Sequence, residues 1–230
     1  MMDERRLTGG RVTKGVTRIG DTVRRPAGPN SRFVRALLAY LERCGFEAAP
    51  RYLGSDERGR EIFSFHHGYV PADLDSGIPD TVLVSAARLI RRFHDATAGA
   101  PIADQGEVVC HNDLSPCNFV FREDKPVAII DFDAAAPGER LDDVGYALFL
   151  WLNLGTDGPP PHEQARRIQL FCDAYGVVAD ATVVEATIRA VVSNIERLRA
   201  AERLTDVEWW QAQLDWLNNH RRELISSLPA

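Results

Sequence analysis

Apolar residues in the first quarter of the chain come in short alternating runs, the pattern of β-strands. Two such runs, 16–19 and 22–25, flank the dipeptide Gly20-Asp21, which is a turn signal between the strands of a hairpin. Pro26 ends the second run, because proline has no N–H to donate to a sheet. We therefore predict an antiparallel hairpin at this point of the chain.

A helical pattern follows the hairpin. Apolar residues recur every three or four positions from Ser31, a suitable N-cap, until Gly45, which predicts one helix. Alternation returns over 61–65 and predicts another strand, before Gly68 and Pro71 break the pattern. This part of the chain thus combines strands with a single helix.

Beyond Pro79 the periodicity becomes mainly helical. A helix is predicted from Asp80 through "DTVLVSAARLIRRFHDAT". One hairpin then interrupts the helices, with strands at 119–121 and 127–130 around the polar turn "REDKP". Three helical stretches follow, and the last opens with a capping-box pattern at Thr205. The chain is therefore predicted to be α+β, with a small part at 1–70, a larger and mainly helical part at 71–230, and a cleft between them.

Composition limits the classes of partner. With 230 residues, of which 45% are hydrophobic, the chain can bury a sizeable core. A net charge of -6 argues against a general nucleic-acid binder, which needs a basic surface to displace counterions. Small or cationic partners fit this charge better. Among 27 basic residues only Lys14 and Lys125 are lysines, so a function that requires lysine has two candidates.

The cysteines and the apolar runs bear on the cellular compartment. Four cysteines form no CxxC pair, and the N-terminal "MMDERRLTGG" lacks the apolar core of a signal peptide, so we expect a cytoplasmic protein. The longest apolar run, "YALFLWLNLG", is shorter than the roughly 20 residues that span a bilayer. No second ligand pair completes a zinc site around Cys110, His111 and Cys117.

The segment "HNDLSPCNFVF" carries the clearest candidate chemistry. It places His111, Asp113 and Asn118 ahead of the predicted hairpin, and Asp131 follows the hairpin in "IIDFD". Phosphoryl transfer needs a carboxylate that accepts the proton of the attacking hydroxyl and hard oxygen ligands for Mg²⁺. The order His-x-Asp, four residues, Asn, strand, turn, strand and Asp is the order found in kinases. The hairpin returns Asp131 towards Asn118, so that both can bind one metal.

Each of these residues also has a structural interpretation. His111 can cap the loop, Asp113 can form an Asx-turn with its own backbone, and Asn118 can satisfy turn amides. A strand ending in "IIDFD" can place one aspartate at the surface and another in a turn. The combination of three polar residues at this spacing with the correct hairpin between them favours the catalytic interpretation.

"HNDLSPCNFVF" with "IIDFDAAAPGERLDDVGYAL" resembles the aminoglycoside phosphotransferase and choline kinase-like family, relatives of the protein kinases. The likeness extends less sharply to "LTGGRVTKGVTRIGDTVRRP" and to "RLIRRFHDAT". It implies a protein-kinase-like two-lobed fold, with a nucleotide-binding lobe at 1–70 and a helical lobe at 71–230 that carries the catalytic loop and the metal-binding hairpin. ATP or GTP and Mg²⁺ are the implied cofactors.

The resemblance also implies roles for individual residues. Asp113 corresponds to the catalytic base, and Asn118 and Asp131 correspond to the Mg²⁺ ligands. Asp133 corresponds to the last position of the metal-strand motif, whose role varies within the family and which lies near the metal or the substrate. The remaining two matches are bracing positions of the catalytic loop, namely His111 and Asp143.

The phosphate-binding side departs from the family pattern. The strand position of the family's lysine is occupied by an arginine, Arg24, while Lys14 lies one strand too early. Arginine keeps the charge but is longer and planar. The only acid of the helix from Ser31, Glu42, lies near its C-terminal end, although the lysine's glutamate partner is expected nearer the middle. Gly10, with the glycine before it, suits either a phosphate-binding loop or any tight turn.

The leading functional hypothesis is a Mg²⁺-dependent small-molecule kinase that transfers the γ-phosphate of ATP or GTP to a substrate hydroxyl. The alternative is a kinase-like nucleotide-binding module with little or no transferase activity. A metal-dependent phosphoesterase would need more ligands than these segments supply. The segment 151–230 has more acids than arginines, which permits a cationic acceptor, although a solvated helix face gives the same balance. Neither the acceptor, nor a role in antibiotic resistance, nor the oligomeric state follows from the sequence.

Overall fold

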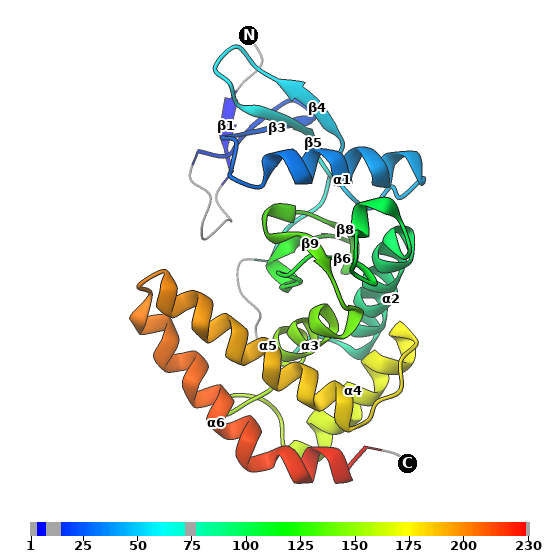
Figure 1. Ribbon diagram of the computed structural model, residues 1–230, viewed down its shortest axis with the longest axis vertical. Coiled ribbons are helices and arrows are strands. Elements are labelled where there is room, and N and C mark those ends of the chain that lie inside the picture. The colour runs from blue at the N-terminus through cyan, green and yellow to red at the C-terminus, as the bar shows by residue number, and fades with distance from the viewer. Residues whose placement is uncertain (1–3, 8–14, 72–76, 229–230) are drawn as a thin grey trace.

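The computed structural model describes residues 4–7, 15–71 and 77–228. Figure 1 shows a small part with a β-sheet and one helix above a larger part that is mainly helical. The helices of the larger part lie beyond residue 79, where the sequence pattern changes from alternation to helical periodicity. The fold is thus the mixed α and β arrangement expected from the sequence.

A five-stranded antiparallel sheet forms the small part. Its strand order is β1-β2-β3-β5-β4. The predicted hairpin is confirmed, because β2 and β3 pair around Gly20-Asp21 with Ile19 opposite Thr22. Two strands of the sheet were not predicted, since one has no apolar residue and the other contains a glycine. The strands are β1 (Glu4–Arg6), β2 (Thr17–Ile19), β3 (Thr22–Arg25), β4 (Tyr52–Ser55) and β5 (Glu61–Ser64).

Helix α1 (Ser31–Arg43) covers the face of the sheet that looks towards the larger part (Figure 1). The predicted helix is confirmed, and its periodic apolar residues form one buried face, which contains Val34, Leu37, Leu38 and Leu41. The expected N-cap role of Ser31 is wrong. Ser31 is the first helical residue, and its hydroxyl bonds to the Gly28 amide and to the Glu61 carboxylate instead.

Among the described residues, five α-helices build the larger part, and four of them follow the second hairpin where three were expected. The extra helix is α3, whose second half coincides with the apolar run beginning at Tyr146. Helices α5 and α6 form a long antiparallel pair along one side (Figure 1). The predicted capping box at Thr205 is absent, since α6 begins one residue earlier without a side-chain cap. The helices are α2 (Asp80–Thr97), α3 (Arg140–Trp151), α4 (Pro161–Tyr175), α5 (Ala181–Ala200) and α6 (Leu204–Ser226).

Two small antiparallel sheets lie between α2 and α3. One pairs β6 (Val108–Cys110) with β9 (Ala136–Gly138), and the other pairs β7 (Phe119–Arg122) with β8 (Lys125–Ile129). The second pair is the predicted hairpin. These strands frame the segment that carries the candidate chemistry.

The core of the larger part fixes α3 beneath that segment. Trp151 is 1% exposed, its ring meets Phe119 edge-on at 4.9 Å between centroids, and its Nε1 donates to the Leu114 carbonyl at 2.9 Å. Gly145 lies so close to α5 that a Cβ atom there would be 2.5 Å from the carbonyl carbon of Ala186. Within the described residues, no helix has the length and apolar character needed to cross a membrane.

Candidate active site

The loop after β6 is held from below by a buried carboxylate. Asp143, which is 1% exposed, accepts hydrogen bonds from the backbone amides of His111 at 2.6 Å and Asn112 at 2.7 Å. Its Oδ2 is also 3.0 Å from His94 Nε2. The amide bonds hold Asn112 in the left-handed backbone region, at φ 61°. Asp143 therefore occupies the bracing position that the family resemblance implied.

His111 links the same loop to the end of β8. Its side chain is fully buried, and Nε2 donates to the Ile130 carbonyl at 3.0 Å. Its ring packs against Phe132, with 4.8 Å between centroids. His111 is thus a bracing residue of the loop, and its ring does not line the cleft described below.

The β7–β8 hairpin brings Asp131 back beside Asn118, as its sequence predicted. Phe119 pairs with Ile129, and the Ile130 amide donates to the Asn118 carbonyl at 2.9 Å. Because these pairs lie immediately next to the two candidate ligands, Asn118 and Asp131 are neighbours in space although thirteen positions apart in sequence.

The backbone turns sharply at Asp131. This residue lies in the left-handed region at φ 64°, and a 3₁₀ turn, Phe132–Ala134, follows it. Phe132 is buried against Phe93, and the side-chain amide of Asn30 donates to the Asp133 and Ala135 carbonyls at 3.0 Å each. The turn is therefore fixed from both parts of the molecule.

Asn118 and Asp131 supply donors that suit Mg²⁺. The Asn118 amide nitrogen donates to the Asp113 carbonyl at 2.8 Å, which leaves the amide oxygen as the atom able to bind a cation. Burial and the nearby Asp133 carboxylate raise the pKa of Asp131, and a cation would relieve both effects. No cluster of three His, Cys, Asp or Glu side chains occurs in the described parts. Asn118 and Asp131 would therefore hold a Mg²⁺ ion together with oxygen ligands that the protein does not supply.

The structure brings Arg25, rather than Arg24, to these carboxylates. Arg25 Nη1 lies 3.2 Å from Asp131 Oδ1, and Nη2 bonds to Asp133 Oδ1. Its side chain is 12% exposed, and its buried Nε has no partner among the described residues. Arg24 points to the opposite face of β3, where it bonds to Thr22. Arg24, the arginine expected at the phosphate site, therefore does not face these carboxylates, because side chains of a strand change face at every residue.

The ion pair between α1 and the sheet has the reverse of the expected polarity. Arg35 of α1 donates to the Glu61 carboxylate of β5 at 2.6 Å, and the hydroxyl of Ser31 donates to the same carboxylate at 2.9 Å. Glu61 is 1% exposed and lies opposite Arg25 in the sheet. Glu42 lies elsewhere, 3.7 Å from Arg51 at the exposed end of the helix. The helix thus carries the cation, and the strand carries the acid.

Asp113 has a partner that the sequence did not reveal. The hydroxyl of Tyr146, on α3, donates to Asp113 Oδ1 at 3.1 Å. Burial and the Asp113 charge raise the pKa of Tyr146, so this hydroxyl keeps its proton. In the sequence, Tyr146 is marked only by its position three residues after Asp143, on the same helix. The contact with Asp113 arises because the fold brings the loop to that helix.

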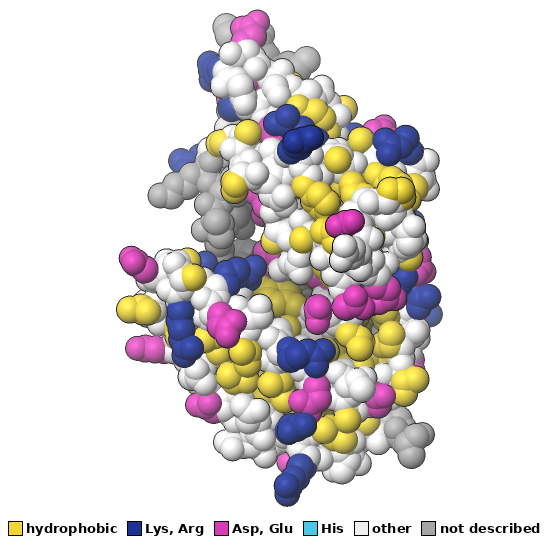
Figure 2. Space-filling view, in the orientation of Figure 1, with side chains coloured by type: hydrophobic (Ala, Val, Ile, Leu, Met, Phe, Trp, Pro, Cys, Tyr) yellow, Lys and Arg dark blue, Asp and Glu magenta, His cyan; other side chains and the backbone are white. Residues whose placement is uncertain are grey.

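A cavity of about 360 Å³ lies between the two parts of the molecule. In Figure 2 the surface is hollowed between them. Most of its walls are apolar, and its polar end contains Arg25, Asn118 and Asp131. One side of the cavity is lined by three residues of the segment between the sheet and the helices, Phe65, His66 and Gly68. Gly10 and Lys14, the other phosphate-site candidates, lie outside the described residues.

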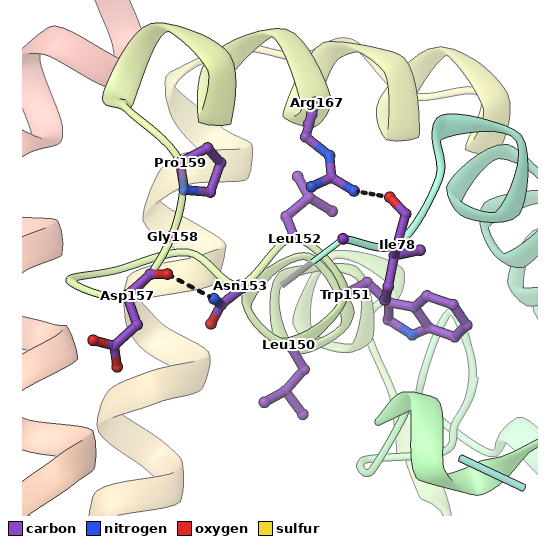
Figure 3. Close-up of a pocket in the computed structure, with 10 residues that line it drawn as sticks. Ile78, Leu150, Trp151, Leu152, Asn153, Asp157, Gly158, Pro159 and Arg167 are labelled. Carbon is purple, nitrogen blue, oxygen red and sulfur yellow. Dashed lines mark hydrogen bonds between the residues drawn. The ribbon is translucent and has the colours of Figure 1, made fainter. Parts of the chain in front are cut away.

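A second cavity, of about 320 Å³, lies at the C-terminal end of α3 (Figure 3). Arg167 reaches towards it from α4 and donates to the Ile78 carbonyl at 2.6 Å. Asn153 and Asp157 are joined across its other side by a 3.1 Å hydrogen bond. None of the predicted site residues lines this cavity, so the cavity between the two parts is the candidate active site.

Comparisons with known proteins indicate the family and the fold of this chain. The model of the family described as "Phosphotransferase enzyme family" matches residues 96–181, which include the loop and the hairpin. The trifolitoxin immunity protein of Rhizobium leguminosarum bv. trifolii is 31% identical over 266 residues, covering 99% of this chain and all of that protein.

Solved structures share the fold at low sequence identity. The gentamicin complex of APH(2")-IIa matches with a TM-score of 0.63 and 12% identity, over 92% of this chain and 90% of that one. The GDP complex of aminoglycoside 2'-phosphotransferase-IIIa matches with a TM-score of 0.63 and 17% identity, over 96% and 93%. Macrolide 2'-phosphotransferase MphH from Brachybacterium faecium has a TM-score of 0.55 and 15% identity, over 86% and 87%.

Proposed function

The chain belongs to the phosphotransferase enzyme family and has its protein-kinase-like fold, and from this premise we propose that it is a Mg²⁺-dependent small-molecule kinase. It transfers the γ-phosphate of ATP or GTP to a hydroxyl of its acceptor, in the cytoplasm. The single observation that carries the proposal is the hairpin that sets Asp131 beside Asn118, with Asp113 bonded to the same asparagine.

Asp113 is the proposed catalytic base. Its carboxylate orients the acceptor hydroxyl and accepts its proton while the oxygen attacks the γ-phosphorus. Asn118 and Asp131 are the proposed holders of Mg²⁺, and the bound ion would neutralise charge on the phosphates. The buried Asp143 keeps the Asp113 loop in place through two backbone amides.

Arg25 is the proposed phosphate-binding residue, in place of the expected lysine. Its guanidinium reaches the metal-side carboxylates through both terminal nitrogens, and its buried Nε has no partner in the described parts of the chain. Guanidinium groups bind phosphate through several donors at once. We assign the nucleotide to residues 1–70 with the hairpin, and the acceptor to the helical part at 71–230.

The acceptor we propose is a small toxic compound with a free hydroxyl. The relative of 31% identity is named as a trifolitoxin immunity protein, and several proteins with the same fold are named for their action on aminoglycosides or macrolides. Phosphorylation adds about two negative charges at neutral pH, which is a chemically simple way to weaken binding of such a compound to its target.

Turnover is the direct test. Purified protein with Mg²⁺ and ATP or GTP is assayed for nucleoside diphosphate release with a panel of hydroxyl-bearing antimicrobial compounds. Asp113→Asn should lower the rate by about two to four orders of magnitude, the usual contribution of a general base. Asp104→Asn is the matched control, because Asp104 is an exposed turn aspartate that, in the described structure, does not line the cavity and has no side-chain bond to the Asp113 loop. Full activity of Asp113→Asn would remove the base, and nucleotide binding without turnover would favour the alternative of a binding module.

The phosphate side has an equally matched pair of variants. Arg25→Ala should weaken nucleotide binding about tenfold to a hundredfold, since hydrogen bonds involving a charged group contribute about 1.5–3 kcal/mol. Arg24→Ala removes the same side chain from the opposite face of the strand and should leave binding unchanged. Isothermal titration with a nonhydrolysable nucleotide measures both. Equal losses in the two variants would contradict the assignment of Arg25.

A further inference from the structure

Tyr146 is the one side chain that donates to the carboxylate of Asp113 within the described structure. The two residues are 33 positions apart in sequence, and the hydroxyl lies 3.1 Å from Oδ1. The other side-chain contact of this residue, from the Asn118 amide, reaches its backbone carbonyl instead. Tyr146 therefore fixes one carboxylate oxygen, and the second remains available to a hydroxyl.

The tyrosine ring is itself held in position by aromatic packing. It stacks on Trp210 of α6 with an interplanar angle of 14° and 6.3 Å between centroids. Trp210 is in turn packed against Phe149, one turn further along α3, at 4.8 Å. At the preceding residue, Gly145, the backbone of α3 lies against that of α5 with no room for a Cβ atom. The donor thus comes from a rigid corner of three helices.

The chemistry of the hydroxyl suits a donor and excludes a base. Burial and the adjacent carboxylate raise the pKa of Tyr146, so the phenol is protonated at neutral pH. A protonated phenol can hold a carboxylate in one rotamer without taking the proton that this carboxylate must accept. General bases require such alignment, because the proton passes along a hydrogen bond of about 2.6–3.2 Å.

We propose that Tyr146 is a positioning residue, which orients Asp113 so that its second oxygen faces the acceptor hydroxyl. This inference rests on the proposed kinase function. As the acceptor oxygen bonds to the γ-phosphorus, its O–H bond breaks and the proton moves to the second oxygen of Asp113. The bond from the γ-phosphorus to the bridging oxygen breaks, and its electron pair leaves with the nucleoside diphosphate. The phenol keeps its own proton throughout.

The test is a double-mutant cycle on phosphoryl transfer. Tyr146→Phe keeps the ring and its stacking but removes the donor, and should lower kcat about tenfold to a hundredfold, with the KM for nucleotide unchanged. If Tyr146 acts through Asp113, the same change made in Asp113→Asn should cause no further loss. Tyr69→Phe is the matched control, because the Tyr69 hydroxyl also donates to a carboxylate, Asp124, at 2.9 Å, on the hairpin turn.

The outcomes separate this inference from the function on which it rests. An active wild type whose kcat is unchanged in Tyr146→Phe overturns the positioning role alone. Equal losses in both backgrounds of the cycle also overturn it, since they indicate a structural effect. A wild type that binds nucleotide but transfers phosphate to no acceptor overturns the function and the positioning role together. The role is established if Tyr146→Phe lowers kcat in the protein that retains Asp113 but not in Asp113→Asn, and if the thermal stability of Tyr146→Phe equals that of the wild type.

Discussion

Replacing Asp143 with alanine should damage both the stability of the fold and the geometry of the catalytic loop. The carboxylate is 1% exposed and has three N–H partners, which are the amides of His111 and Asn112 and the ring nitrogen of His94. Alanine has no acceptor, and the position is closed to bulk solvent. The three N–H groups therefore remain buried without partners.

The expected cost follows from this inventory. A buried donor that loses its acceptor costs about 1–3 kcal/mol, and removing one member of a buried charged network costs about 3–5 kcal/mol. We expect Asp143→Ala to lower the free energy of unfolding by about 3–5 kcal/mol, a large share of the roughly 5–15 kcal/mol of a typical domain. Asp143→Asn keeps the volume and one acceptor oxygen, and should cost about half as much.

Urea denaturation followed by circular dichroism measures the loss, and the turnover assay measures its effect on the loop. Activity should fall further than the folded fraction does, because Asp113 lies two residues beyond the first amide that Asp143 holds. A loss of stability below about 1 kcal/mol in Asp143→Ala would refute the reasoning. It would mean that water or a shifted side chain satisfies the three donors.

Three further predictions concern packing, reactivity and pH. Gly145→Ala should destabilise the protein by about 1–3 kcal/mol in thermal unfolding, because the new Cβ meets α5 backbone that cannot yield. Burial raises the pKa of Cys172 to about 12, so a thiol reagent at pH 8 should modify the exposed Cys44 and reach Cys172 only in denaturant. Asp180 caps α5 through Thr182, and Asp180→Ala should cost about 1 kcal/mol. The hydrogen bonds from Thr182 lower the pKa of Asp180, so the contribution of this cap to the free energy of unfolding is present above about pH 4. It is lost as the pH falls through the folded pKa, where variant and wild type should converge.

The hairpin and the catalytic loop could be predicted because their determinants are local. Asn118 and Asp131 flank two β-type runs and one polar turn, and the antiparallel pairing of 119 with 129 follows directly from that order. The same holds for the Gly20-Asp21 hairpin, whose register the turn sets. Where a turn and its strands lie within about fifteen residues, the sequence pattern defines the local geometry.

The contacts of the site that cross the fold could not be predicted in this way. Tyr146 reaches Asp113 across 33 positions, and Arg35 reaches Glu61 across 26. Nothing in the local pattern distinguishes these residues from ordinary helix and strand positions. The choice between Arg24 and Arg25 fails for a related reason, since both have the same chemistry and only the register against β5 decides which one faces the cleft.

Arg25 and the second aspartate of "IIDFD" explain each other. A guanidinium presents parallel N–H groups that fit two acceptors at once, whereas an ammonium is a single compact charge. Arg25 uses this geometry to bond to Asp131 with one terminal nitrogen and to Asp133 with the other. Asp133 therefore holds Arg25 beside Asp131, in a way that lysine could not match.

The buried Glu61 forms a separate ion pair, between the sheet and α1. It lies opposite Arg25 in the sheet, and its own bonds go to Arg35 and Ser31 of α1. These bonds connect α1 to β5 without a lysine or a helix glutamate. An acid on β5 and a cation on α1 thus join helix and sheet, where the kinase pattern pairs a strand lysine with a helix glutamate. The departures from the family pattern thus correspond to two separate sets of ion pairs, Arg25 with Asp131 and Asp133 in the cleft, and Arg35 with Glu61 between α1 and β5.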